Sequence, residues 1–256
     1  MIIPGLVSIT FRRLPPREIV RLVSEAGLAC IEWGGDIHVP HGNLNAANEV
    51  RGMSEDSGIA VASYGSYYRA GLSEDAGLPF SSVLETALAL NAPGIRVWAG
   101  NKNWEDADSS FKKNVIDDLL RIGCMASSSK ISISLEYHGA TLTSSNESAL
   151  CLAKELAGSN VFFYWQPPVG KDFAYCADGL VKLLDLVSHV HVFHWAAEGG
   201  GIARMPLAKG GREWSKYFEI LSSSGGNHSA MLEHVRDDSP EQFLEDAAIL
   251  KKMTRI

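Results

Sequence analysis

Apolar and polar residues alternate most regularly along residues 131–139, which read Ile-Ser-Ile-Ser-Leu-Glu-Tyr-His-Gly. The odd positions from 131 to 135 are apolar, whereas the even positions from 132 to 136 are small or polar. This pattern is typical of a β-strand with two different faces. The run then stops at Gly139. The pattern therefore predicts a strand that carries the carboxylate of Glu136 at its carboxyl end, on the polar face.

Short apolar runs bounded by glycine, proline or polar residues recur along the chain and indicate further strands. With the run above, the expected strands are 6–11, 28–33, 59–64, 94–99, 131–136, 161–166, 189–194 and 230–233. Between them, apolar residues recur at three- and four-residue spacing, which predicts amphipathic helices. The expected helices are about 15–26, 44–57, 82–90, 111–120, 147–156, 180–186, 214–221 and 239–250. The last helix has a clear start, because Ser239 can cap it and Pro240 suits its first position.

This order of elements is a repeated alternation of strand and helix. Strict alternation implies a parallel sheet with right-handed crossover connections. About eight such units in a chain of 256 residues fit a closed barrel better than an open doubly wound sheet. The glycine fingerprint of a dinucleotide-binding fold is also missing after the first strand. The sequence therefore predicts an α/β protein with a single (β/α)8 TIM barrel domain over residues 1–256, whose chemistry lies on the loops after the strands.

Polar residues end the four late strands of the expected barrel, and they are Glu136, Gln166, His194 and Glu233. Each is separated from the next by about one strand–helix unit, so the four are expected to converge at one end of the barrel. Three oxygen ligands and one imidazole suit Mn²⁺, Mg²⁺ or Co²⁺ better than structural zinc. Each residue alone can equally be a strand-end group bonded to a loop. Two carboxylates in one barrel mouth, however, repel unless a cation or a shared proton relieves them.

Composition and charge narrow the class of protein. The net charge of −7 disfavours a nucleic-acid partner, because phosphate binding needs a basic surface. No apolar run reaches the roughly 20 residues that span a bilayer, and the N-terminus does not resemble a signal peptide. The cysteines are scattered, as expected for reduced thiols in a cytoplasmic protein.

The sequence resembles the xylose isomerase-like barrels, a family of sugar isomerases, ketose 3-epimerases and proteins described as sugar phosphate isomerases or epimerases. The resemblance covers essentially the whole chain. It is carried by Ile-Glu-Trp-Gly-Gly-Asp-Ile-His at 31–38, Leu-Glu-Tyr-His at 135–138, His-Val-Phe-His at 191–194 and Leu-Glu-His at 232–234. The family commonly binds its metal through Glu, Asp, His and Glu at the ends of strands five to eight. The resemblance implies that the matching ligands are Glu136, Gln166, His194 and Glu233.

Two positions depart from the family pattern. Gln166 stands where aspartate is usual; its amide oxygen can still ligate, but the site loses one negative charge and should hold the ion less tightly. Val169 stands where the family often has a histidine, so substrate contacts there must differ.

The resemblance implies a metal-dependent sugar or sugar phosphate isomerase or epimerase. It would use one divalent ion, with Mn²⁺ ranked ahead of Mg²⁺, Co²⁺ and Zn²⁺. The ion polarises a carbonyl and stabilises an enediolate, while Glu136 and Glu233 remove and return the proton. A metal-dependent lyase similar to the dehydroshikimate dehydratases is one alternative. A non-catalytic sugar-binding barrel, with Gln166 marking a decayed site, is another, whereas the acidic charge disfavours an apurinic endonuclease of this fold.

The expected partner is a small carbohydrate, and a homo-oligomer is compatible with the sequence although no stretch indicates an interface. Aromatic residues at the same end of the barrel can stack on sugar C–H faces, and loop histidines or arginines can bind sugar oxygens. The candidates for substrate binding are His38, Tyr64, Trp98, His138 and Arg204. A plain loop role is the alternative for each of them. His189 and His191 are interpreted as structural, and a flexible glycine-rich loop is expected after residue 194.

Overall fold

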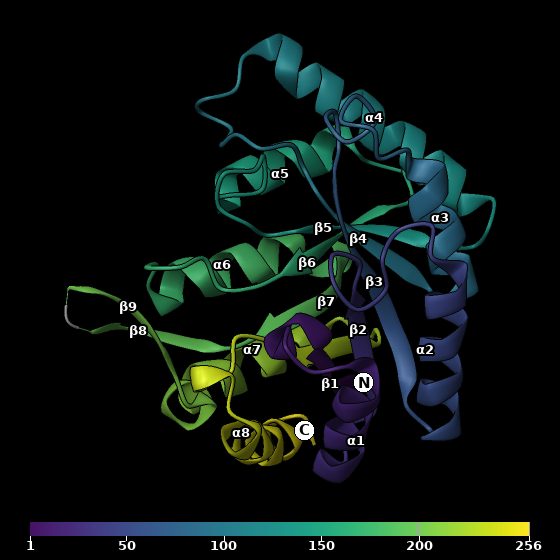
Figure 1. Ribbon diagram of the computed structural model, residues 1–256. Helices are drawn as coiled ribbons and strands as arrows, with labels where there is room; N and C mark the ends of the chain where they lie inside the picture. The colour runs from purple at the N-terminus through teal and green to yellow at the C-terminus, as the bar shows by residue number, and fades with distance from the viewer. Residues whose placement is uncertain (199, 256) are drawn as a thin grey trace.

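The computed structural model describes residues 1–198 and 200–255. It contains a closed barrel of parallel strands with helices between them (Figure 1), which confirms the predicted (β/α)8 TIM barrel. Neighbouring strands follow the chain order around the barrel, and the first strand closes it against the last, with Leu6 paired to Leu232. Among the described residues, no helix combines the length and the hydropathy needed to cross a membrane.

The barrel strands are β1 (Ile2–Val7), β2 (Cys30–Gly34), β3 (Ala60–Arg69), β4 (Gly94–Trp98), β5 (Ser132–Glu136), β6 (Val161–Trp165), β7 (Val187–Val192) and β10 (His228–Leu232). The main helices are α1 (Pro16–Ala26), α2 (Leu44–Asp56), α3 (Phe80–Ala89), α4 (Ser109–Ser127), α5 (Asn146–Glu155), α6 (Phe173–Leu183), α7 (Gly211–Ser223) and α8 (Pro240–Met253). Most bounds lie within a few residues of the predicted ones.

Side-chain caps fix where several helices begin. Ser239 accepts a hydrogen bond from the backbone N–H of Gln242 at 3.2 Å, which confirms the predicted start of α8. Asp172 caps α6 in the same way, accepting from the N–H of Tyr175 at 2.8 Å. This cap starts α6 seven residues before the helix that the apolar pattern predicts. A polar cap is a weaker sequence signal than periodicity, because aspartate is also common in loops.

The outer and inner faces of the barrel strands pack against different parts of the protein. Side chains that point outward, such as Ile133, Leu135 and Val190, are fully buried against the helices in the main apolar core. Inside the barrel, a small apolar cluster forms a floor beneath the polar strand ends; the cluster consists of Val7, Cys30, Ala62, Tyr164 and Met231. The polar residues at the carboxyl ends of the same strands lie beyond this floor. The alternation along each strand therefore places charged groups at one end of the barrel.

The structure differs from the predicted elements at several strands, and β3 extends five residues beyond the predicted 59–64. The first strand ends at Val7, and Ser8–Phe11 forms a 3-10 turn instead of continuing it. Strand β7 begins and ends two residues before the predicted strand 189–194. The expected glycine-rich loop includes an antiparallel hairpin of β8 (His194–Glu198) and β9 (Gly201–Met205), which extends away from the barrel (Figure 1). Gly199 of that loop lies outside the described residues.

Candidate metal centre and active site

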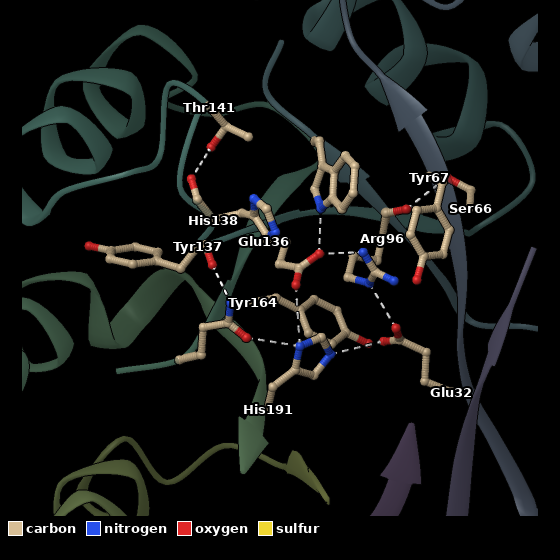
Figure 2. A network of polar contacts seen from close by, with 12 residues as sticks. Glu32, Ser66, Tyr67, Arg96, Glu136, Tyr137, His138, Thr141, Tyr164 and His191 are labelled. Atoms are coloured by element: carbon tan, nitrogen blue, oxygen red, sulfur yellow. Dashed lines mark hydrogen bonds and ion pairs between the residues drawn. The ribbon is translucent and has the colours of Figure 1, made fainter. Parts of the chain in front are cut away.

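Four potential metal donors meet at the carboxyl ends of neighbouring strands. The Nδ1 atom of His191 lies 3.1 Å from Oε1 of Gln166, 3.3 Å from Oε2 of Glu233 and 3.6 Å from Oε1 of Glu136. Glu136, His191 and Glu233 are buried, and each offers an atom within 4.8 Å of the others. Figure 2 shows His191 below Glu136, with its ring turned toward the carboxylate. Three oxygens therefore lie within 3.6 Å of this one nitrogen.

The histidine in this cluster is His191, and His194 lies elsewhere. Strand β7 ends at Val192, so its odd positions face into the barrel while Val190 and Val192 pack outward in the core. His194 is the first residue of β8, with its ring against Gly210. The prediction of strand 189–194 took its even positions as the inward-facing ones, whereas in the structure the odd positions face the barrel interior. His191, interpreted there as structural, takes the position beside the two glutamates.

A buried ion-pair network supports His191 from its other side. Its Nε2 atom lies 3.4 Å from Oε2 of Glu32. Glu32 also accepts a hydrogen bond from Nε of Arg96 at 2.7 Å and from Oγ of Ser63 at 2.9 Å. A carboxylate on the far nitrogen of a metal-binding histidine fixes its ring orientation and raises its basicity. Glu32 is positioned to do this for His191.

The two oxygens of Glu136 have different surroundings. Arg96 and the indole N–H of Trp98 both donate to Oε2, and Figure 2 shows the guanidinium between Glu136 and Glu32. Oε1 faces His191. The Arg96 contacts hold the carboxylate in one orientation while leaving one oxygen available for a cation.

These contacts decide the charge states of the buried groups. Burial alone raises the pKa of Glu136, but the charges of Arg96 and His191 outweigh it and lower the pKa to about 2. The pKa of Glu32 is likewise lowered, by Arg96 and His191 against the effect of burial. Burial lowers the pKa of His191, but Glu233 and Glu32 raise it well above its ordinary value. Without a metal, a proton on His191 thus provides part of the positive charge that the carboxylates require.

One atom of the cluster is left without a hydrogen bond. Oε2 of Glu233 is buried and has no hydrogen bond of good geometry among the described residues; its neighbours are the ring nitrogens of His191 at 3.3 Å and His234 at 3.4 Å. A buried, unsatisfied carboxylate oxygen is costly. A divalent cation between this oxygen, Oε1 of Glu136, Oε1 of Gln166 and Nδ1 of His191 would satisfy it. The residues present therefore fit a metal ion, and the mixed oxygen and nitrogen donors suit Mn²⁺, Mg²⁺, Co²⁺ or Zn²⁺.

A cavity of about 530 Å³ opens over the cluster. Of the residues predicted to bind substrate, Trp98 and His138 line it, with their rings 4.8 Å apart. His38 is buried beside Ser8, its Nδ1 2.9 Å from the serine Oγ, and is absent from the lining.

The other two predicted substrate residues are also bonded within the protein. Tyr64 is buried and donates to the backbone carbonyl of Val39 at 2.8 Å. Arg204 pairs with Asp238 at 2.6 Å, on the loop that follows Glu233. Neither residue lines the cavity, so the structure brings only two of the five candidates to it.

Tyr67 was missed by the sequence analysis, although it lines the same cavity. Its backbone is left-handed, with φ of 56°, where the pairing of β3 with β4 shifts register. Its hydroxyl accepts a hydrogen bond from Nη2 of Arg12 at 2.9 Å, and its ring lies 5.1 Å from the guanidinium carbon of Arg96. Left-handed backbone in a bulky residue is strained, and strand irregularities often re-aim side chains at active sites.

Glu32 and Arg96 were missed too, but the sequence contained a signal for them. Each is a single charged residue inside an otherwise apolar strand, in Cys-Ile-Glu-Trp and Gly-Ile-Arg-Val. A charge on the inner face of a barrel strand needs an opposite charge nearby. The pair could therefore have been predicted from the barrel fold and the strand parity together.

No protein-family model and no curated sequence matches the chain, but solved structures match it over almost its full length. One is the probable 3-DHS dehydratase AsbF from Bacillus anthracis, with 19% identity, a TM-score of 0.80 and coverage of 98% of this chain and 99% of that chain. A D-psicose 3-epimerase in the presence of D-fructose has 16% identity, a TM-score of 0.71 and coverage of 98% and 97%. A xylose isomerase-like TIM barrel protein from Mycobacterium smegmatis, in complex with magnesium, has 15% identity, a TM-score of 0.70 and coverage of 98% and 96%.

The protein thus has the fold of the xylose isomerase-like TIM barrel proteins. Solved structures of that fold include an epimerase and a probable dehydratase. At these identities the likeness concerns the fold.

Proposed function

We propose that the protein is a metal-dependent enzyme that moves a proton on the carbon next to the carbonyl group of a small carbohydrate, as an isomerase or epimerase. The observation that carries the proposal is the convergence of Glu136, Gln166, His191 and Glu233 on one point, with one buried carboxylate oxygen left without a hydrogen bond of good geometry.

These four residues would hold the ion, and we propose Mn²⁺ as the ion. When bound, it would supply Lewis acidity that polarises the carbonyl and acidifies the neighbouring C–H. Gln166 gives the site one negative charge fewer than an aspartate would. The amide is oriented by its own contact, since its nitrogen donates to the backbone carbonyl of Tyr137 and its oxygen faces His191.

Glu136 and Glu233 are the proposed bases. They come from β5 and from the end of β10, the two outer strands of the four that carry the donors, so they flank His191 and Gln166. The pKa of each glutamate is lowered despite burial, so both carboxylates are ionised, and the same shift makes each a weaker base than a free glutamate. In an epimerase, one ionised carboxylate removes the proton from one face of the carbon, and the other, after taking a proton from solvent, supplies that proton to the opposite face.

Tyr67 is the proposed hydrogen-bond donor to a substrate oxygen. Arg12 occupies an acceptor position on its hydroxyl, which leaves the phenolic proton free to donate into the cavity. The apolar side chains of Trp98, Phe193 and Trp195 line the same cavity and limit the water around the reacting carbon.

A lyase that removes water is the second candidate, and one observation favours it. The solved structure with a TM-score of 0.80 is that of a probable dehydratase. In this reaction the base takes a proton from one carbon and the neighbouring carbon loses its hydroxyl group. A C=C bond forms, and the hydroxyl leaves as water after receiving a proton, for which Tyr67 is a suitable donor. The same metal donors serve both reactions.

The first test compares two histidines three residues apart. Metal content is measured by elemental analysis on protein purified without chelator and then incubated with Mn²⁺. We expect the parent and the His194→Ala control to retain a single divalent ion per chain, and His191→Ala to lose it. Retention of the ion by His191→Ala would overturn the assignment of the centre, as would a parent protein that takes up no metal.

The second test measures proton transfer in D₂O by NMR with a panel of aldoses and ketoses. We expect exchange of a substrate C–H for C–D, abolished by Glu136→Gln and by Glu233→Gln. A growing ultraviolet absorbance from a new C=C bond, without such exchange in recovered substrate, would support the lyase instead. Absence of both reactions with a metal-loaded protein would contradict the proposed enzyme class for these substrates.

A further inference from the structure

A second cavity of about 320 Å³ adjoins the one over the metal centre. The two share walls formed by the loop after β6, at 167–169, and by Phe193 and Trp195. The first cavity alone already has the volume of a small-ligand site, for which about 300–1,000 Å³ is usual. The adjoining cavity therefore extends the site beyond the space next to the metal centre.

Aromatic rings form the walls of this second cavity. Phe173 stacks on Tyr217 with ring centroids 5.2 Å apart and planes 26° apart, and Trp214 packs behind Tyr217 at 5.4 Å. Flat aromatic faces of this kind favour another planar ring over a flexible chain. Phe173 remains 39% exposed at the N-terminal end of α6.

Two further apolar side chains lie at the edge of the cavity and are open to solvent. Val169 is 47% exposed and Ile202 is 55% exposed. Large apolar side chains that gather around a concavity, rather than being scattered singly, indicate a binding surface. Polar groups at the same cavity, including Lys171 and Glu213, can bond hydroxyl substituents at the edge of a bound ring.

The chain segment that encloses this cavity is anchored to the barrel. It connects β7 to α7 and is the longest of the connections that follow the barrel strands. Its base is held where the N–H of Leu207 donates to Oδ1 of Asp246 at 2.9 Å, and its second strand is held by the Arg204–Asp238 ion pair. Long connections in compact domains are usually functional. Here the hairpin contributes Ala196, Ala197 and Ile202 to the cavity wall.

We infer that the second cavity binds a planar apolar ring that is part of the substrate. The substrate class is then a sugar conjugate that carries both an aryl group and a carbonyl group, with its sugar over the metal centre and its ring against Phe173 and Tyr217. This inference rests on the proposed function for the position of the sugar. The shared wall at 167–169 and Trp195 is the reason for assigning both cavities to one molecule.

The test is a binding measurement that does not require turnover. Phenyl and methyl glycosides of D-glucose, D-galactose and D-xylose have no free carbonyl and therefore serve as non-reacting probes; they are titrated as matched pairs into the Mn²⁺-treated protein by isothermal calorimetry. We expect the phenyl glycoside of at least one pair to bind about tenfold more tightly than its methyl partner, since burial of a ring of this size contributes at least that much. Equal affinities within every pair, or no binding of any phenyl glycoside, would overturn the inference.

Two variants test which residue causes the preference for phenyl over methyl glycosides. Phe173→Ala should reduce the phenyl-over-methyl ratio to about one, whereas Val181→Ala, on the same helix and 56% exposed outside the cavity, should leave it unchanged. A ratio unaffected by Phe173→Ala would place the ring elsewhere and overturn the inference. Tighter binding of cellobiose than of phenyl glucoside would also overturn it, because the cavity would then favour a second sugar.

The same samples separate this inference from the proposed function. If the phenyl preference depends on Phe173 but no metal is bound, the ring subsite stands and the metal enzyme fails. If metal and proton exchange are present but the preference is absent, the proposed function stands and the subsite fails.

Discussion

The cavity over the metal centre and the aromatic cavity share a wall. The residues of the metal centre are mostly charged, whereas those of the aromatic cavity are mostly apolar. In the centre, Glu32, Arg96, Glu136 and His191 are buried charged groups, each on a barrel strand and each in contact with an oppositely charged partner. In the aromatic cavity, the side chains belong to loops, helices and the hairpin; Trp214 and Tyr217 are buried, whereas Val169, Phe173 and Ile202 remain partly exposed. A site on strands has its geometry fixed by the fold, whereas a site on loops can change without disturbing the barrel. We therefore associate the centre with the reaction and the cavity with the choice of substrate.

The largest effect that would test this contrast is expected at Arg96. Arg96→Met leaves Glu32 and Glu136 buried without their cation, so the free energy of unfolding should fall by about 3–5 kcal/mol. Urea unfolding of the metal-free protein measures it. Arg121→Met is the matched control, because Arg121 is 41% exposed and should contribute about 1 kcal/mol or less. If Arg96→Met does not fold, the double variant Glu32→Gln/Arg96→Met should recover part of the loss. A cost below about 1 kcal/mol would show that the network is not held by charge.

The next effect concerns the strength of metal binding. Gln166→Asp adds a negative charge beside His191 and the two glutamates, so Mn²⁺ should bind about tenfold more tightly, or by about 1.4 kcal/mol. Competition with a fluorescent chelator measures the affinity. Gln166→Leu removes the donor oxygen and should weaken binding. An unchanged affinity in both variants would mean that position 166 does not contact the ion.

A smaller effect is expected at the base of the hairpin, and it depends on pH. Burial of Asp246 raises its pKa from 3.8 to about 6. A carboxyl group with a raised folded-state pKa stabilises the protein below its unfolded pKa and loses that contribution as pH rises through its folded pKa. Relative to Asp246→Asn, the parent should therefore lose about 1–2 kcal/mol of unfolding free energy between pH 4 and pH 7, after allowance for solvent screening. Urea unfolding of both proteins across this range measures the difference, and parallel pH profiles would contradict the prediction.

The smallest effect is expected in the aromatic cavity itself. Ile202→Ser replaces a side chain that is already 55% exposed, so the free energy of unfolding should change by about 0.5 kcal/mol or less. Thermal or urea unfolding measures it. A loss above about 2 kcal/mol would mean that the hairpin supports the fold, and the distinction between a fixed centre and an adaptable cavity would fail.

The fold was predictable because each of its elements has a local signal. The alternation at 131–136 and the cap at Ser239 depend only on nearby residues, and repeated units of this kind define the barrel. The end of β7 was not predictable in the same way. The segment Val-Ser-His-Val-His-Val-Phe-His has apolar and polar residues that fit more than one register, with no glycine to stop it. The even positions of this strand were taken as the inward-facing ones, although the odd positions face the barrel interior, and this led to His194 instead of His191.

The rest of the candidate site depends on contacts across the barrel. Arg96 meets Glu32 and Glu136 only after the barrel closes, and Tyr67 reaches the cavity only because β3 is irregular after Gly65. Neither fact follows from neighbouring residues. The second cavity was harder to predict than the metal centre, since one of its walls is a hairpin where the sequence indicated a flexible loop.

The buried charged groups of the site are divided between the two halves of the chain. All four proposed metal donors lie in or after β5, whereas Glu32 and Arg96, which orient two of them, belong to β2 and β4. If the backbone were cleaved in the turn between α4 and β5, one fragment would retain the donors and the other would retain the groups that orient them. The halves of this barrel are therefore not interchangeable modules, and only their reassociation would restore a site in which His191 is held in place.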